Sequence, residues 1–393
     1  MRIILFLFFS VVIAVAGYFA YTKYLNPDTV DVTKINEIKI YTSNQSELDI
    51  EVEQIRSIPK QPKNIDQLEY YGWIPDWDMV SGFETLQNNT FIKNVSPFWF
   101  DLNEDGTLKT TLYTNWDDLI YYTQDNNIKL IPTITSFDKD KLSSVLNSQE
   151  NTDRFINETI DYAVTYGYAG VDLDFELFYI NDQKLFLEML RTLKDRLAEH
   201  GKFLQFSALA KWGDHISYSQ SKATLDYTKM GEIIDQFIIQ GYSYTIHSSD
   251  HIGAIGPIDW LEDVIRYAIK SGIPREKLIL GIHTYAIDWP ERAIEYDLTY
   301  YSESGLSFTP SESENGVAYY HNGIDKLFDN YEVTTKFIEN WGEMMGEYDY
   351  GGVTRVVVWP NNESIQLRKQ LAADYGIKGI AYWRLGDEGS LQL

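Results

Sequence analysis

Three acidic residues alternate with apolar residues in one short stretch, GYAGVDLDFE (residues 167–176). Asp172, Asp174 and Glu176 stand two positions apart, and large apolar residues occupy the positions between them. In a β-strand, residues two apart point to the same face, so the three carboxyl groups start about 6.6 Å apart on one side. Carboxyl groups enclosed together cannot all stay ionised at low cost, so at least one pKa rises. A carboxyl group that keeps its proton near neutral pH is what general acid catalysis needs.

The acidic stretch is also compatible with two structural roles. It could be a solvated edge strand, although Gly170 and the apolar pair 177–178 flank it instead of turn residues. It could instead coordinate a cation in a membrane-tethered structural protein. Carboxylates do bind Ca²⁺, but ligands at alternate positions of one strand lack the loop wrapping that such sites favour. The pattern therefore favours a general acid in an enclosed site.

The acidic stretch belongs to a regular alternation of short apolar runs and helix-like segments that begins near Leu68. Eight runs are predicted strands: 68–75, 92–102, 128–137, 167–176, 203–211, 237–244, 278–285 and 379–385. Continuous apolar character is typical of parallel strands buried on both faces. Eight strands alternating with helices predict an α/β fold, the (β/α)8 TIM barrel, whose active site forms at the carboxyl ends of the strands.

Amphipathic segments between the runs have recognisable ends. Predicted helices stop at Gly167, Gly201 and Gly272, and glycine is the usual residue just after a helix. One connection is longer than the rest, because residues 286–356 separate the seventh and eighth predicted strands. A structureless loop of that length is uncommon, so we expect a small α+β insertion there.

Composition excludes several classes of function. The chain of 393 residues has 33 basic and 58 acidic side chains, a formal net charge of −25 that argues against nucleic acid as a partner. It has no cysteine, and its six histidines show no metal-binding spacing. We therefore expect no metal site and no cofactor, and we expect a monomer.

The first 22 residues contain an apolar run of about 18 residues, just long enough to cross a bilayer. Run length favours an uncleaved membrane anchor, while the small residues of 14–16 leave a cleaved signal peptide open. Residues 23–65 are polar and are expected to form a linker or arm. Residues 66–393 are expected to form the barrel, either anchored outside the cell membrane or secreted.

The acidic stretch resembles the D-G-x-D-x-D-x-E signature of family 18 glycoside hydrolases, the chitinase-like barrels. Gly170 and the three acids agree with the signature, whereas Ala169 stands where the first Asp is usual. Residues 94–108, 256–289 and 363–388 look like the bacterial branch that includes spore-cortex and cell-wall N-acetylglucosaminidases. The resemblance covers most of residues 68–388.

The resemblance implies a role for each matching residue. Glu176 would protonate the glycosidic oxygen, Asp174 would hold the substrate's acetamido N–H, and Asp172 would share a proton with Asp174. Tyr242, in QGYSY, occupies the place of the tyrosine in the family's M-x-Y-D motif and would bind the acetamido oxygen. Trp383, in GIAYWRL, would stack under the sugar ring.

The M-x-Y-D position also differs from the family in two residues. Gln240 replaces the usual Met and Ser243 the usual Asp, and both are expected, with Trp383, among the substrate-binding residues. The resemblance implies a retaining, substrate-assisted hydrolase of β-1,4-linked N-acetylglucosamine glycan, chitin-like or peptidoglycan, without a cofactor. The alternative is a catalytically weak, chitinase-like carbohydrate-binding protein, which the departures at Ala169, Gln240 and Ser243 support and the intact Glu176 opposes.

Overall fold

The computed structural model describes residues 53–110, 116–214, 218–249, 251–290, 300–301, 317–319, 321–386 and 388–393. The predicted anchor or signal peptide, residues 1–22, lies outside the described residues, as does most of the predicted arm, 23–65. No helix in the described ranges combines the length and the apolar character needed to cross a membrane.

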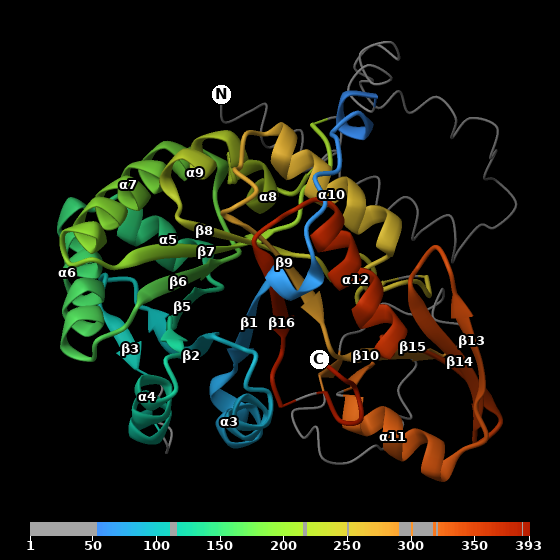
Figure 1. Cartoon of the computed structure of the whole chain (residues 1–393). Coiled ribbons are helices and arrows are strands. Elements are labelled where there is room, and N and C mark those ends of the chain that lie inside the picture. Colours follow the sequence, from blue (N-terminus) through green and yellow to red (C-terminus); the bar gives the residue numbers. More distant parts are fainter. Residues whose placement is uncertain are drawn as a thin grey trace, which may run out of the picture. The chain divides into compact units, whose positions relative to one another are not determined.

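Eight parallel strands close into a barrel, as the alternating pattern predicts (Figure 1). The ring closes because the first strand pairs in parallel with both the second and the last. In ring order the strands are β1 (Glu69–Ile74), β2 (Asn94–Leu102), β5 (Thr133–Ser136), β6 (Gly170–Phe175), β7 (Phe203–Leu209), β8 (Gln236–Gln240), β9 (Leu278–His283) and β16 (Gly379–Trp383). Two short strands also pair with β2: β3 (Leu108–Thr110), antiparallel, and β4 (Lys129–Leu130), parallel.

Helices cover the outside of the barrel, where they follow the strands in the chain (Figure 1). They are α3 (Met79–Asn88), α4 (Trp116–Asp125), α5 (Lys139–Leu146), α6 (Gln149–Thr165), α7 (Gln183–Glu199), α8 (Gln220–Thr224), α9 (Tyr227–Ile233), α10 (Ile258–Lys270) and α12 (Asn362–Asp374). Single 3-10 turns lie at η3 (Ile65–Gln67), η4 (Asp76–Asp78) and η5 (Ile180–Asp182). The three predicted glycine stops adopt positive φ angles of 69° at Gly167, 67° at Gly201 and 90° at Gly272, the left-handed conformation that ends a helix.

Apolar side chains fill two layers, one on each face of the barrel strands. The larger layer lies between strands and helices and includes Val171, Leu173 and Phe175 of β6. A smaller cluster, which includes Trp73, Phe98 and other strand residues, has Trp383 packed against it. Because side chains alternate along a strand, the even-numbered acids of β6 point away from the first layer and into the barrel.

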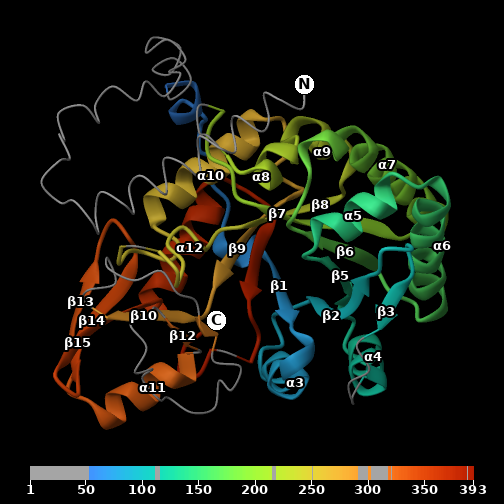
Figure 2. The ribbon, with the colours of Figure 1, turned by 180° about the vertical axis from the view of Figure 1, so that it is seen from behind.

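The long connection between β9 and β16 forms the predicted α+β insertion, whose own sheet is antiparallel except for the parallel pair β11–β12 (Figure 2). Its strands are β10 (Ala286–Pro290), β11 (Tyr300–Tyr301), β12 (Val317–Tyr319), β13 (Thr334–Ile338), β14 (Glu343–Tyr350) and β15 (Val353–Trp359), and its helix is α11 (His321–Asn330). The sheet has its own apolar cluster, in which Leu327 and Val357 are fully buried.

The described part of the expected arm contacts the barrel. Ile55 is 3% exposed and belongs to the larger apolar layer. Further along, the Lys63 amide donates to the Ala373 carbonyl at 3.0 Å, and Lys60 forms an ion pair with Asp374 at 2.9 Å. Residues 53–65 thus lie against α12 and the segment that leads into β16.

Candidate active site

Asp172 lies at the centre of the barrel interior, held by hydrogen bonds from three strands. Its side chain is fully buried, and its Oδ2 accepts from Trp73 Nε1 at 3.2 Å and from Thr133 Oγ1 at 2.9 Å. Ser207 Oγ donates to Oδ1 at 2.9 Å. Burial raises the pKa of Asp172, and these donors, together with Gln205, partly offset that rise.

Asp174 and Glu176 share a single hydrogen-bond donor. Gln240, the last residue of β8, donates from Nε2 to Asp174 Oδ1 at 2.9 Å and to Glu176 Oε1 at 3.0 Å. Burial, and then the charges of Glu176 and Asp172, raise the pKa of Asp174 well above its ordinary value. Burial also raises the pKa of Glu176, against the lowering effect of Gln240 and Lys222. A proton is therefore retained in this pair at a pH at which isolated carboxyl groups would have lost theirs.

Tyr242 and Trp383 border the acids at the carboxyl ends of β8 and β16. Burial, followed by the nearby Asp174 and Glu176 charges, raises the pKa of Tyr242 well above its ordinary value, so its hydroxyl remains a donor. Trp383 is the last residue of β16, and its ring lies 5.9 Å from that of Trp73, the residue that donates to Asp172. The peptide bond between Trp383 and Arg384 is cis.

Ser243 does not join the acids in the described structure. Its side chain is exposed, and its Oγ lies 3.5 Å from Tyr285 Oη, at the base of the insertion. Its φ angle of 60° is unusual for a residue other than glycine. Sequence reasoning placed Ser243 among the substrate-binding residues, and the structure places it at the rim of the site.

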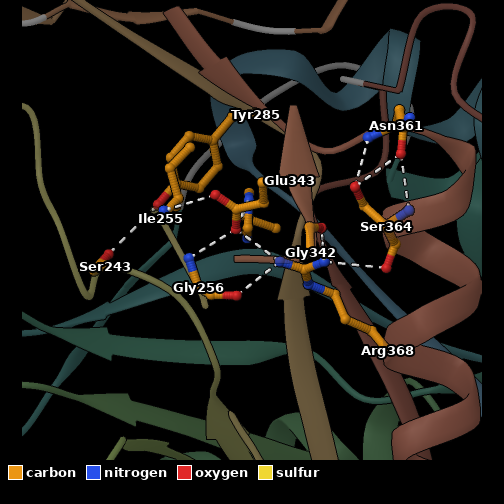
Figure 3. Close-up of polar contacts among 10 residues, drawn as sticks. Ser243, Ile255, Gly256, Tyr285, Gly342, Glu343, Asn361, Ser364 and Arg368 are labelled. Atoms are coloured by element: carbon orange, nitrogen blue, oxygen red, sulfur yellow. Dashed lines mark hydrogen bonds and ion pairs between the residues drawn. The ribbon is translucent and has the colours of Figure 1, made fainter. Parts of the chain in front are cut away.

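A buried ion pair anchors the loop that carries Tyr242 and Ser243 (Figure 3). Glu343 of β14 accepts from the backbone amides of Ile255 and Gly256, both at 2.9 Å. Arg368 of α12 donates to Glu343 Oε1 and to the Gly256 carbonyl oxygen, both at 2.7 Å. Both side chains of the pair are fully buried. The insertion and the barrel helix α12 thus meet at one carboxylate that holds the loop from its far end.

The departure at Ala169 lies outside the acid cluster. Ala169 immediately precedes β6 and is three residues before Asp172, a distance of about 10 Å along a strand. Its amide and carbonyl pair with neighbouring backbone groups of Leu130 and Phe203. By contrast, position 170 requires glycine, because a Cβ atom there would lie 2.4 Å from the Phe203 carbonyl oxygen. Gly170 permits the close pairing of β6 with β7.

Sequence reasoning did not identify the side chains that hold Asp172. Thr133 and Gln205 are its direct neighbours in the parallel registers of β5 and β7, and Ser207 follows Gln205 by two residues. A signal for them existed, because polar residues alternate within the apolar runs TITS and FLQFSAL just as acids do in β6. Lys222, whose charge lowers the pKa of Glu176, had no such signal, since it lies on the separate helix α8.

The geometry suits proton transfer to an acceptor above Glu176. The amide of Gln240 occupies the place between two carboxyl groups where a bound cation would have to sit, and an N–H group repels a cation. Among the described residues no group of three or more metal-binding side chains is arranged to hold an ion. The site therefore combines two carboxyl groups with raised pKa values, a tyrosine hydroxyl and an aromatic ring at the end of β16.

Comparisons with known proteins identify the family of this chain. The family model described as glycosyl hydrolases family 18 matches residues 41–388. The cortical fragment-lytic enzyme of Bacillus anthracis is 27% identical over 304 residues, which are 76% of this chain and 66% of that protein, just under two-thirds of its length.

Two crystal structures share the fold. The Bacillus cereus spore cortex-lytic enzyme SleL has a TM-score of 0.70 at 24% identity, over 82% of this chain and 72% of that one. The chitinase from Chromobacterium violaceum ATCC 12472 also has a TM-score of 0.70, at 18% identity, over 82% of this chain and 96% of that one. Because the family model covers most of the barrel and includes the acidic strand, the chain belongs to glycosyl hydrolases family 18.

Proposed function

We propose that the protein is a retaining, substrate-assisted hydrolase that cleaves β-1,4 bonds of an N-acetylglucosamine-containing glycan. The observation that carries the proposal is the pair of Asp174 and Glu176 on one Gln240 amide, with Tyr242 beside them. Substrate assistance distinguishes this family from glycosidases that use a second enzymic carboxylate as nucleophile.

In the proposed reaction Glu176 donates its proton to the glycosidic oxygen. The carbonyl oxygen of the substrate's own 2-acetamido group attacks the anomeric carbon, and the bond to the leaving sugar breaks. Glu176, now ionised, takes a proton from water, which opens the resulting oxazolinium ion and leaves the anomeric configuration retained. The raised pKa of Glu176 favours the protonated form that the first step needs.

Asp174 and Tyr242 would hold the acetamido group during this attack. The Asp174 carboxylate accepts the acetamido N–H and stabilises the positive charge of the oxazolinium ion, while the Tyr242 hydroxyl donates to the acetamido oxygen. Asp172 keeps its proton or releases it to Asp174 as the charge moves, and its donors Thr133 and Ser207 hold it in place. Trp383 would stack under the ring of the same sugar.

Among acetamido glycans we propose peptidoglycan or a related envelope glycan ahead of chitin. The name of the Bacillus anthracis relative, a cortical fragment-lytic enzyme, supports an envelope substrate. The apolar run in residues 1–22 supports it too, because an anchored or exported enzyme meets the envelope first. Detergent dependence and the mass of the mature chain test this placement: a detergent-independent protein starting at Gly17 would rule out the anchor.

The test of the reaction compares wild type with Glu176→Gln on N-acetylglucosamine oligomers and on purified peptidoglycan, by release of reducing ends. The proposal predicts hydrolysis by wild type and a loss of at least about a hundredfold in the variant. Equal inertness of both proteins, with oligosaccharide still bound, would instead identify a carbohydrate-binding protein.

A further inference from the structure

Thr284 lies at the junction of the barrel and the insertion. Strand β9 ends at His283, and the first strand of the insertion, β10, begins at Ala286. In the parallel pairing of β9 with β16, His283 is the direct neighbour of Trp383. Thr284 is therefore the first residue beyond this ladder on the β9 side, and it is fully buried.

Three hydrogen bonds connect Thr284 with Trp383 and Arg384. The Thr284 amide donates to the Trp383 carbonyl oxygen at 2.8 Å. The Thr284 Oγ1 donates to the Arg384 carbonyl oxygen at 3.0 Å and accepts from the Arg384 amide at 2.8 Å. A hydroxyl group has one hydrogen to donate and lone pairs with which to accept. Both functions of the Thr284 hydroxyl are thus used on the backbone of one residue.

Contacts from the other side of the ring hold the same segment. The Leu385 amide donates to the Trp73 carbonyl oxygen of β1 at 3.0 Å. The Arg384 guanidinium donates to Asp78 Oδ2 of η4 at 2.8 Å, and its side chain is only 2% exposed. The backbone that follows Trp383 is therefore held from β1 and η4 on one side and by Thr284 on the other.

Two aromatic rings border Trp383 without enclosing it. The ring centroids of Trp73 and Phe98 lie 5.9 and 5.1 Å from that of Trp383, and Trp383 remains partly exposed. Contacts between aromatic rings tolerate several angles, so the direction of the ring depends on the backbone from which its Cβ atom projects. That backbone continues directly into Arg384, which the Thr284 hydroxyl binds.

The residues on either side of Thr284 connect the same junction with Tyr242. The ring centroid of Tyr285 lies 6.4 Å from that of Tyr242 and 5.3 Å from that of His283. One short segment thus contacts both the tyrosine assigned to the acetamido oxygen and the backbone of the tryptophan assigned to the sugar ring. A shift of Trp383 against this segment changes its position relative to Tyr242.

We propose that Thr284 is a positioning residue, whose hydroxyl fixes the backbone at Arg384 and thereby the Trp383 ring on which the acetamido sugar stacks. The identity of that sugar rests on the proposed function, whereas the orientation of the Trp383 ring does not. A ring that turns away from the sugar loses the stacking contact and the alignment that the reaction needs.

The experiment uses Thr284→Val, which keeps the branched shape and loses the hydroxyl, and Thr284→Ser, which keeps the hydroxyl. Thr159→Val is the matched control, because Thr159 is a buried threonine of α6 whose Oγ1 donates to the Phe155 carbonyl oxygen at 2.8 Å. Each substitution is also made together with Trp383→Ala. All proteins are compared under conditions in which urea unfolding shows them to be folded.

Steady-state kinetics on an N-acetylglucosamine oligomer provide the first readout. Thr284→Val is expected to lower kcat/KM by at least about tenfold, mainly through KM, since a misplacement of about 1 Å can cost about a hundredfold. Thr284→Ser and Thr159→Val are expected to retain the wild-type value. Combined with Trp383→Ala, Thr284→Val should cause no further fall, because the ring through which it acts is absent. A full loss that persists in this background would overturn the inference.

Circular dichroism tests the position of the Trp383 ring without a substrate. The rings of Trp73 and Trp383 lie 5.9 Å apart with their planes at 68°, so their electronic transitions couple, and this coupling depends on the angle between the rings. The contribution of Trp383 is the difference between each protein and the same protein with Trp383→Ala. This difference spectrum is expected to shrink in Thr284→Val and to stay unchanged in Thr284→Ser and Thr159→Val.

The two readouts separate a wrong role for Thr284 from a wrong function for the protein. If wild type cleaves the oligomer and the difference spectra of wild type and Thr284→Val are identical, Thr284 does not position the ring, and the hydrolase assignment stands. If wild type neither cleaves nor binds the oligomer, the proposed function fails, and the difference spectra alone decide the role of Thr284. Should Thr284→Val not fold, Thr284→Ala takes its place with the same expected results, because it removes the hydroxyl without placing a methyl group against the Arg384 backbone.

Discussion

Arg368→Met tests whether the buried ion pair of the insertion positions the active-site loop. Arg368 donates four hydrogen bonds at 2.7–3.1 Å, one to the Glu343 carboxylate and three to backbone carbonyl oxygens. Methionine fills much of the same volume but donates none. The Glu343 carboxylate would then keep the two backbone amides of the loop as its donors and lose its cationic partner.

The expected loss in the free energy of unfolding of Arg368→Met follows from the burial of the ion pair. Both side chains are fully buried, and removing one partner of a buried ion pair costs about 3–5 kcal/mol. Part of this cost depends on pH, because burial raises the pKa of Glu343 and Arg368 lowers it. A carboxyl group with a raised folded-state pKa is destabilising when ionised. Arg368→Met is therefore expected to lower the free energy of unfolding more above the folded-state pKa of Glu343 than in acid, where Glu343 is protonated.

Activity provides the second readout. The loop that ends at Gly256 begins with Tyr242, and a shift of about 1 Å in a substrate-positioning group can cost about a hundredfold in rate. Arg355→Met is the matched control, because Arg355 pairs with the equally buried Asp288 at 2.9 Å inside the insertion. Both variants are expected to lose stability in urea unfolding, and Arg368→Met alone is expected to lose kcat/KM at a temperature at which both are folded.

A double variant, Arg368→Met with Glu343→Gln, guards against a protein that fails to fold. It removes both charges and leaves an acceptor for the loop amides, so it should recover much of the stability. The reasoning is wrong if the two single variants lose kcat/KM equally while folded, or if Arg368→Met costs the same stability in acid as at neutral pH.

Three further predictions concern the site itself. Gln240→Met removes a donor that lowers the pKa of both Asp174 and Glu176. The alkaline limb of the kcat/KM profile, where the acid loses its proton, should therefore move to higher pH. A limb at an unchanged or lower pH would count against the bridging role of Gln240. Asp174→Asn should reduce kcat by about a hundredfold with little change in KM, as expected for a group that acts mainly in the transition state, and steady-state kinetics would expose a pure KM effect. Trp383→Ala should raise the KM for oligosaccharides, because a stacking platform is lost, and a KM equal to that of wild type would remove Trp383 from the binding site.

The barrel could be predicted because its signals are local. Each strand is a short apolar run, and glycines at 167, 201 and 272 mark where helices end. The acids of β6 were identifiable for the same reason, since a period of two is visible within a single strand. Residues 286–356 were recognisable as an insertion from length alone, although the sheet extends to Trp359.

The parts of the site that could not be predicted from the sequence depend on contacts between segments that are distant in the chain. Glu343 receives the Ile255 amide across 88 positions of the chain, and nothing in either segment indicates the other. Helix α8 lies against the segment that follows Glu176 because the Phe178 amide donates to Ser221 Oγ, 43 positions further along the chain. The bridging by Gln240 is of the same kind, because its two carboxylate partners lie in and directly after β6, which β7 separates from β8 in the ring. Such partners become visible only when the ring of strands is closed.

The central claim is that the substrate's acetamido group, and not an enzymic carboxylate, attacks the anomeric carbon. The most direct measurement compares wild-type kcat for an N-acetylglucosamine oligomer and for the same oligomer with trifluoroacetamido groups, whose carbonyl oxygen is a much weaker nucleophile. Substrate assistance predicts a fall in kcat of at least about a hundredfold, because the attacking group itself is weakened. Equal kcat values for the two oligomers would contradict it.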